Sequence, residues 1–187
     1  MFSLISCSAM AGVAEWVCCP GELNAPLYRA LADCPAVHRW SVADDRSAAF
    51  FALGRVQATG RPVVVVAGSG SSAAAMTPAV IHAYYHRRPL VVLTMDSAGG
   101  CGGTGAPQCV EQEALFGMYA PTVELNLPCP VSDLPNLVEE LGEGFPLHLH
   151  VRLYAAAEPP YSDFSAIEVN GPPPAPRFRG SLAEVAQ

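Results

Sequence analysis

The sequence predicts a three-layer α/β/α domain built around a central parallel sheet of about six strands. Between residues 15 and 153, short apolar runs alternate with longer amphipathic segments, the order typical of βαβ units. Two runs, 62–67 and 89–95, are almost wholly apolar, as expected of strands buried on both faces. Hydrophobic residues make up 51% of the chain and charged residues 14%, a balance that suits buried strands covered by helices.

In chain order, short β-branched or aromatic runs bounded by turn residues predict the strands. Pro20-Gly21 closes the first run, and four consecutive valines make the third the clearest. The last run has alternating character. The expected strands are residues 15–19, 37–42, 62–67, 89–95, 122–127 and 146–153.

The segments between these runs have the apolar spacing or the cap residues of helices. Asp44 or Asp45 can cap the second helix, and Gly60 can end it. A tight turn of sequence GSGSS, residues 68–72, leads into the third helix, and a Gly-rich loop at 97–107 precedes the fourth. The expected helices are residues 25–34, 45–59, 73–86, 108–119 and 131–141.

The domain organisation follows from a change in composition after residue 154. We expect residues 1–156 to form a single domain and residues 157–187 to form an extended, proline-rich C-terminal tail. At the N-terminus, no basic region precedes Cys7 and the apolar stretch is too short for a signal peptide. We therefore expect no secretion signal.

Charge and cysteine usage exclude several classes of function. The net charge of −7 argues against nucleic-acid binding, which needs a basic surface. No apolar run approaches the roughly 20 residues that span a membrane. The seven cysteines are odd in number and form no CxxC pair, which favours reduced thiols in the cytoplasm. The five histidines show no metal-binding spacing, so we expect no metal site on this chain.

Three motifs could carry chemistry, although each also has a purely structural reading. Residues 68–72 can bring backbone N–H groups to a ligand, or form only a tight turn between a strand and a helix. Asp44 and Asp45 can act on a ligand or only cap a helix. Residues 102–108 with Gln112 can form a binding loop or only lead into a helix. The sequence contains no GxGxxG fingerprint, which argues against a generic nucleotide-binding domain.

Taken together and in this order, the motifs resemble one family. Residues 17–151 are similar to the pyrimidine-binding (PYR) domain of thiamine-diphosphate-dependent enzymes. Within that class they most resemble the N-terminal domain of the menaquinone-pathway synthase of 2-succinyl-5-enolpyruvyl-6-hydroxy-3-cyclohexene-1-carboxylate (SEPHCHC). The resemblance is carried by CPG at 19–21, DDRSAAFFALG at 44–54, ATGRPVVVV at 58–66, RPLVVLT at 88–94, GAPQ at 105–108, Gln112 and PLHL at 146–149.

The resemblance implies a cofactor, a metal and a partner. Thiamine diphosphate would lie between this PYR domain and a diphosphate-binding (PP) domain, which holds Mg²⁺ through a GDG motif that this chain lacks. The PP domain would then belong to a partner subunit, giving an α2β2 heterotetramer. The implied cofactor-binding residues are Pro20, Gly21, Asp45, Gly68, Ser69, Gly70, Ser71 and Ser72. The implied substrate-binding residues are Glu22, Leu23, Asn24, Gln108 and Gln112.

Two departures from the family bear on catalysis and specificity. Asp45 stands where the family has the glutamate that activates the cofactor, and its carboxylate reaches about 1.5 Å less. We expect Asp45 to remain the catalytic residue, with a slightly shifted helix. Residues 21–24, GELN, replace a Gly-Ser-Arg-Ser stretch, so an arginine that would bind a substrate carboxylate is lost. This predicts an acceptor smaller or less anionic than that of the menaquinone enzyme.

The sequence thus predicts the PYR subunit of a two-subunit enzyme. It would decarboxylate a pyruvate-like 2-oxo acid and release or transfer the resulting acyl or aldehyde unit. The alternative is a catalytically silent partner subunit that completes an interface without forming the cofactor's ylide. Neither a nucleic acid nor a membrane is an expected partner.

Overall fold

The computed structural model describes residues 2–68, 70–97, 103–105, 110–127 and 144–153, together with residues 136, 139 and 141. The expected helix at 131–141 lies almost entirely outside these residues. So does the boundary expected between the domain and its tail.

A six-stranded sheet forms the centre of the molecule, and every adjacent pair of strands is parallel. Its spatial order is β2-β1-β3-β4-β6-β5. The strands are β1 (Glu15–Cys18), β2 (His38–Ser41), β3 (Val63–Val66), β4 (Leu90–Ser97), β5 (Thr122–Leu127) and β6 (Leu147–Leu153). All six coincide, within two residues at either end, with strands predicted from the sequence.

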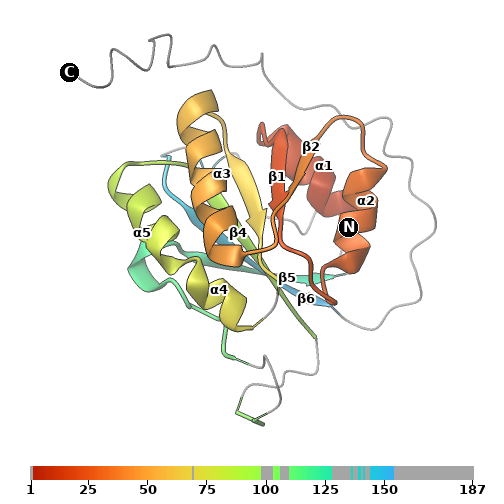
Figure 1. Ribbon diagram of the computed structural model, residues 1–187, viewed down its shortest axis with the longest axis vertical. Helices are drawn as coiled ribbons and strands as arrows, with labels where there is room; N and C mark the ends of the chain where they lie inside the picture. The colour runs from red at the N-terminus through yellow and green to blue at the C-terminus, as the bar shows by residue number, and fades with distance from the viewer. Residues whose placement is uncertain are drawn as a thin grey trace.

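Helices cover both faces of this sheet, with α1 and α2 on one face and α3, α4 and α5 on the other (Figure 1). The three-layer α/β/α prediction is confirmed. The helices are α1 (Phe2–Met10), α2 (Ala25–Ala32), α3 (Asp45–Thr59), α4 (Ser71–Ala75) and α5 (Thr77–Tyr85), with a 3-10 turn η1 (Gly117–Tyr119). No described helix is both long enough and apolar enough to cross a membrane.

The valine run of β3 shows how the sheet divides the core. Val64 and Val66 pack into the cluster beneath α1 and α2, whereas Val63 and Val65 pack beneath α3 and α5. All four are at most 1% exposed. Burial on both faces explains why this strand lacks the alternation of a half-exposed strand.

Two helix predictions need correction, and one helix was not predicted. The helix predicted at 73–86 is two helices, α4 and α5, which meet at Met76, because Pro78 lies in the first turn of α5 and suits a helix start. The helix predicted at 108–119 is absent from its described part, residues 110–119, which form turns and η1. Ala114 and Gly117 there have φ of 53° and 51°, which an α-helix cannot contain. Helix α1 was not predicted, yet Leu4 and Ile5 are buried in the core.

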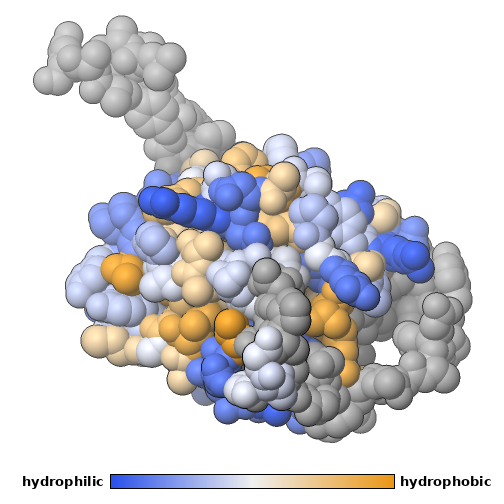
Figure 2. Space-filling view, turned by 60° about the horizontal axis from the view of Figure 1, so that its bottom comes forward, coloured by the Kyte–Doolittle hydropathy of each residue, from blue (hydrophilic) through white to orange (hydrophobic). Residues whose placement is uncertain are grey.

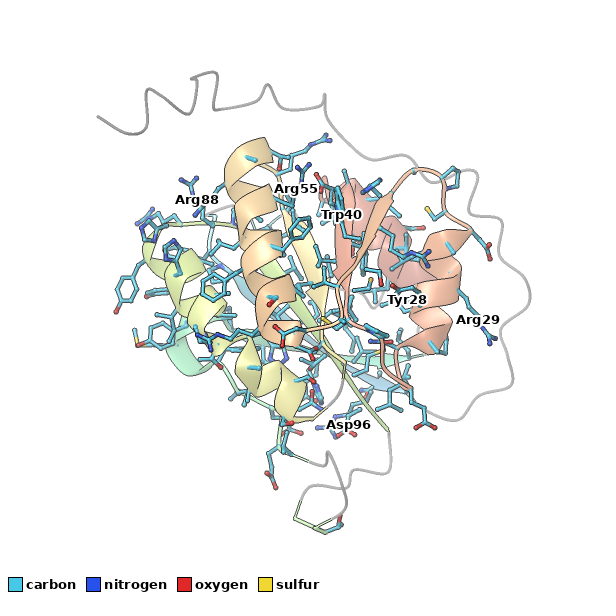
Figure 3. The ribbon with its side chains drawn as sticks, in the orientation of Figure 1. Tyr28, Arg29, Trp40, Arg55, Arg88 and Asp96 are labelled. Carbon is cyan, nitrogen blue, oxygen red and sulfur yellow. The ribbon has the colours of Figure 1, made fainter. Side chains whose placement is uncertain are left out.

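Polar side chains fix α3 at the amino edge of the sheet. Arg55 donates through Nε and Nη2 to the Glu15 carboxylate, each at 2.7 Å, and Trp40 Nε1 donates to Glu15 Oε2 at 2.8 Å. Burial would raise the pKa of Glu15, but these hydrogen bonds outweigh it and lower the pKa below its usual value. Figure 3 shows Trp40 and Arg55 together at this end, away from Asp96 at the carboxyl end of β4.

Candidate active site

The candidate site lies where the strand order of the sheet reverses. β1 pairs with β2 on one side and with β3 on the other, so the chain segments that leave β1 and β3 diverge at their carboxyl ends. A crevice at such a point is the usual ligand site of open parallel sheets. Pro20 and Gly21 follow β1 here, and Gly68 follows β3.

The two aspartates at the start of α3 have different roles. Asp44 caps the helix, because its Oδ1 accepts a 2.7 Å hydrogen bond from the Ser47 amide. Asp45 is half-buried, and its Oδ1 accepts a 2.8 Å hydrogen bond from the Gly68 amide. The structural reading of this motif therefore applies to Asp44. Asp45 instead turns its carboxylate toward the carboxyl end of β3.

Gly21 and Gly68 bring two loops into backbone contact. A Cβ atom on Gly21 would lie 2.3 Å from the Gly68 carbonyl oxygen, closer than any side chain tolerates. A Cβ on Gly68 would lie 3.4 Å from both Asp45 Oδ1 and the Pro20 carbonyl oxygen. These glycines let the loops after β1 and β3 lie in backbone contact beside the Asp45 carboxylate.

Asn24 lies beneath this contact and is 1% exposed. Its Nδ2 donates to the carbonyl oxygens of Cys19, at 2.7 Å, and Ala67, at 3.0 Å. Its Oδ1 accepts from the Gly21 amide at 3.0 Å. All three of these hydrogen bonds join backbone groups of the two loops, so Asn24 holds the loops together.

The other sequence-predicted residues are spread around this centre. Gly70 is buried with φ of 49° and precedes α4, whose first residues are Ser71 and Ser72. Glu22 is exposed, whereas Leu23 packs against the core cluster of α1 and α2. Ser69 and Gln108 lie outside the described residues.

Gln112 carries an unsatisfied acceptor near the carboxyl end of β4. Its side chain is 5% exposed, and its Nε2 donates to the Met95 carbonyl oxygen at 3.4 Å. Within the described part of the chain, its buried Oε1 has no hydrogen-bond partner. Because an unpaired buried acceptor is costly, Oε1 is suited to a donor on a bound ligand.

Cys19 is a neighbour of Asp45, although the sequence analysis used it only as part of the CPG motif and assigned it no role at the site. Burial raises the pKa of its thiol above the usual value, and the charge and hydrogen bonding of Asp45 raise it further. The thiol therefore stays protonated beside the carboxylate. Sequence reasoning missed this residue because its position relative to Asp45 depends on the pairing of β1 with β2 and β3.

A hollow of about 330 Å³ opens beside Pro20 and Gly21. It extends along α2 as far as Tyr28 and Arg29, both labelled in Figure 3. The hollow is large enough for a small ligand group next to the loop after β1.

These groups fit the pyrimidine half of thiamine diphosphate. The Asp45 carboxylate and the unpaired Gln112 Oε1 are both hydrogen-bond acceptors, which suits a ring that carries N–H donors. Across the described ranges, no group of three or more His, Cys, Asp or Glu could hold a metal ion.

Comparison with known proteins points to the same cofactor. Residues 3–115 match the family model described as thiamine pyrophosphate enzyme, N-terminal TPP binding domain. This range includes Gly21, Asp45, Gly68 and Gln112, and all of α1 except Phe2.

Curated relatives share the name 2-succinyl-5-enolpyruvyl-6-hydroxy-3-cyclohexene-1-carboxylate synthase. The chain is 45% identical over 189 residues to the synthase of Akkermansia muciniphila, which covers 99% of this chain and 34% of the relative. It is 46% identical over 133 residues to that of Geobacillus kaustophilus, which covers 71% of this chain and 23% of the relative. The chain thus spans about a third or less of the length of these relatives.

Proposed function

The chain belongs to the family of thiamine pyrophosphate enzymes through their N-terminal TPP binding domain, and on that premise we propose that it is the PYR half of a decarboxylase or carboligase. The enzyme decarboxylates a pyruvate-like 2-oxo acid and releases or transfers the resulting acyl or aldehyde unit. A PP domain on a partner subunit holds Mg²⁺ and the diphosphate.

The observation that carries this proposal is the Asp45 carboxylate, held by the Gly68 amide at the carboxyl edge of the sheet. Thiamine diphosphate, when bound, supplies the carbon nucleophile that makes decarboxylation of a 2-oxo acid feasible. Asp45 is the catalytic residue, and its carboxylate takes and returns the proton of the aminopyrimidine. Its partial burial beside the neutral Cys19 thiol keeps bulk water from competing for that proton.

The remaining site residues bind the cofactor and orient the reacting groups. The cofactor ring binds against the backbone of Pro20, Gly21, Gly68 and Gly70, and Ser69, Ser71 and Ser72 are further cofactor-binding residues. Gln112 orients the reacting groups through its free Oε1, with Gln108 in the same role. Glu22 and Leu23 lie on the substrate side.

Two candidate reactions differ in the substrate that accepts the acyl or aldehyde unit. Leu23 and Glu22 stand where an arginine would bind a carboxylate, which supports an acceptor smaller or less anionic than a dicarboxylate. The second candidate is the reaction of the relatives, formation of a succinyl-enolpyruvyl-hydroxycyclohexene-carboxylate. It is favoured by 45% identity across 99% of this chain. Assay of the assembled enzyme with pyruvate, 2-oxoglutarate and isochorismate separates the two candidates, since only the second requires isochorismate turnover.

The catalytically silent alternative rests on the shortened side chain of Asp45. The deciding experiment mixes the chain with its PP subunit, thiamine diphosphate and Mg²⁺, and measures carbon dioxide released from 2-oxo acids. We expect release by the wild-type complex and loss of release in Asp45→Asn, with cofactor still bound in both. Bound cofactor without carbon dioxide release from any 2-oxo acid would instead support the silent role.

An exposed apolar surface on α3 supports the proposed partner. Phe50 and Phe51 are 43% and 38% exposed, one to two turns along the helix that begins with Asp45. Figure 2 shows further hydrophobic residues exposed on the side of the molecule that lies at the bottom of Figure 1. Exposed apolar patches of this kind mark interfaces. We expect an α2β2 heterotetramer by analytical ultracentrifugation, and we expect Phe50→Asp to dissociate it.

We also propose a cytoplasmic location. Cys18, Cys19 and Cys34 are buried free thiols, as is usual in a reducing compartment. Fractionation of cells that express the tagged chain would test this.

A further inference from the structure

We infer that Asn24 is a positioning residue of the reaction, because its amide fastens the loop after β1 to the loop after β3 and so fixes the group that holds Asp45. This inference rests on the proposed function of Asp45. Asn24 does not contact Asp45 through a hydrogen bond of its own. Its influence on the position of the Asp45 carboxylate is transmitted by Gly68.

The chemistry of the contact requires a carboxamide. The carbonyl oxygens of Cys19 and Ala67 are both acceptors, so the atom between them must donate twice, as Nδ2 does. On the other side of the side chain, the Gly21 amide requires an acceptor, which is Oδ1. Serine offers a single donor and aspartate none, so neither can make all three bonds.

The bonded groups lie immediately next to the site. Cys19 precedes Pro20, Ala67 precedes Gly68, and Gly21 packs against the Gly68 carbonyl oxygen with no room for a Cβ atom. Asn24 therefore sets the separation of two loops that touch through backbone. Gly68 cannot move relative to Gly21 without breaking one of the three bonds.

Gly68 links the position of the loops to the carboxylate of Asp45. Its carbonyl side contacts Gly21, and its amide donates to Asp45 Oδ1 at 2.8 Å. A shift of the loop after β3 therefore moves the amide that orients Asp45. Because misplacement of a reacting group by about 1 Å can cost roughly a hundredfold in rate, loosening this contact should affect the proton transfer.

The test measures hydrogen–deuterium exchange at C2 of thiamine diphosphate in the complex of the chain with its PP subunit. We expect Asn24→Ala to slow exchange by about ten- to hundredfold and Asn24→Ser, which keeps one donor, to slow it less. The affinity for thiamine diphosphate should change by no more than about threefold, because the diphosphate is held by the partner. Thr94→Val is the matched control, since Thr94 is equally buried but its side-chain hydroxyl is hydrogen-bonded to His148 and His150.

A double variant separates positioning from general destabilisation. If Asn24 acts through Asp45, then Asn24→Ala should slow exchange no further in an Asp45→Asn background. An independent loss in the double variant would overturn the inference, as would wild-type exchange in Asn24→Ala. Equal slowing in Thr94→Val would also count against it. If the wild-type complex does not exchange C2–H at all, the proposed function fails, and that result is distinct from these.

Discussion

The Gly68 amide donates a 2.8 Å hydrogen bond to Oδ1 of Asp45, and this bond joins the start of α3 to the carboxyl end of β3. The neighbouring Asp44 satisfies the helix cap, so Asp45 is not required there. At the other end of α3, the Arg55 side chain is bonded to Glu15. The helix is therefore fixed at both ends, and the position of its first carboxylate depends on the loop that it contacts.

Lengthening this side chain is a direct test of its reach. In Asp45→Glu the carboxylate extends about 1.5 Å further, to the length found in the family that the sequence resembles. We expect exchange at C2 of bound thiamine diphosphate to rise by about an order of magnitude, because a proton relay needs about 2.6–3.2 Å between heavy atoms. Proton exchange followed by quenched-flow NMR measures this. Slower exchange in Asp45→Glu would mean that the bond to Gly68 already places the aspartate correctly.

The close contact of Gly21 with Gly68 predicts a steric effect. In Gly21→Ala the new Cβ would meet the Gly68 carbonyl oxygen at 2.3 Å, so the loops must separate. We expect the free energy of unfolding to fall by about 1–3 kcal/mol and cofactor binding to weaken. Urea denaturation measures the stability of the variant.

A second glycine provides the control for this variant. Gly54 is exposed in the interior of α3, and a Cβ atom added to it would meet nothing within 4 Å. Gly54→Ala should therefore raise the free energy of unfolding by roughly 0.5–1 kcal/mol, since alanine restricts the unfolded chain and favours helix. If both alanine variants were equally stable, the steric explanation for Gly21 would be wrong.

Local patterns predicted the sheet well, because its strongest signals are local. The valines of β3, the aspartate cap of α3 and the left-handed Gly60 all act within a few residues of their own position. The failures have equally specific causes. Helix α1 shows little amphipathic character, and the left-handed backbone at Ala114 is a conformation that no alanine signals.

The sequence predicted which residues belong to the candidate site but not the contacts between them. The sequence motifs identified Asp45, Gly21 and Gly68, but only the order of the strands brings them together. The motifs could not decide which of two aspartates caps α3. Nor could they show that Asn24 bonds to the loop after β3, since its Ala67 contact spans 43 residues of sequence.

The thiols of Cys18 and Cys19 should be unreactive in the folded protein. Burial raises the pKa of Cys18 to about 12 and that of Cys19 further, so little thiolate exists near neutral pH. Peptide mass spectrometry after iodoacetamide treatment at pH 8 should find both unmodified, and both alkylated in urea. Because unfolded thiols ionise near pH 8.5, the unfolded state holds fewer protons above that pH, and stability should fall as the pH rises. Rapid alkylation of Cys19 in the native protein would contradict its burial beside Asp45.

A buried histidine pair predicts sensitivity to acid. Thr94 Oγ1 lies 2.9 Å from His148 Nε2 and 3.0 Å from His150 Nδ1, and Thr122 Oγ1 lies 2.9 Å from His148 Nδ1. Burial, with a smaller contribution from repulsion by a protonated His150, lowers the pKa of His148 to about 3. Burial also lowers the pKa of His150, although Glu124 and Asp96 partly oppose this. Both rings are therefore neutral in the folded protein at neutral pH.

The sign of the pH effect follows from proton binding. Between about pH 6.5 and pH 3 the unfolded chain protonates His148 and the folded chain does not, so stability falls as the pH falls. The slope is at most about 1.4 kcal/mol per pH unit for each such histidine. Urea denaturation between pH 6.5 and 5 should show a shallower slope in His148→Gln, which cannot titrate. The exposed His86 is the matched control, and His86→Gln should keep the wild-type slope. An unchanged slope in His148→Gln would show that His148 is protonated in the folded protein.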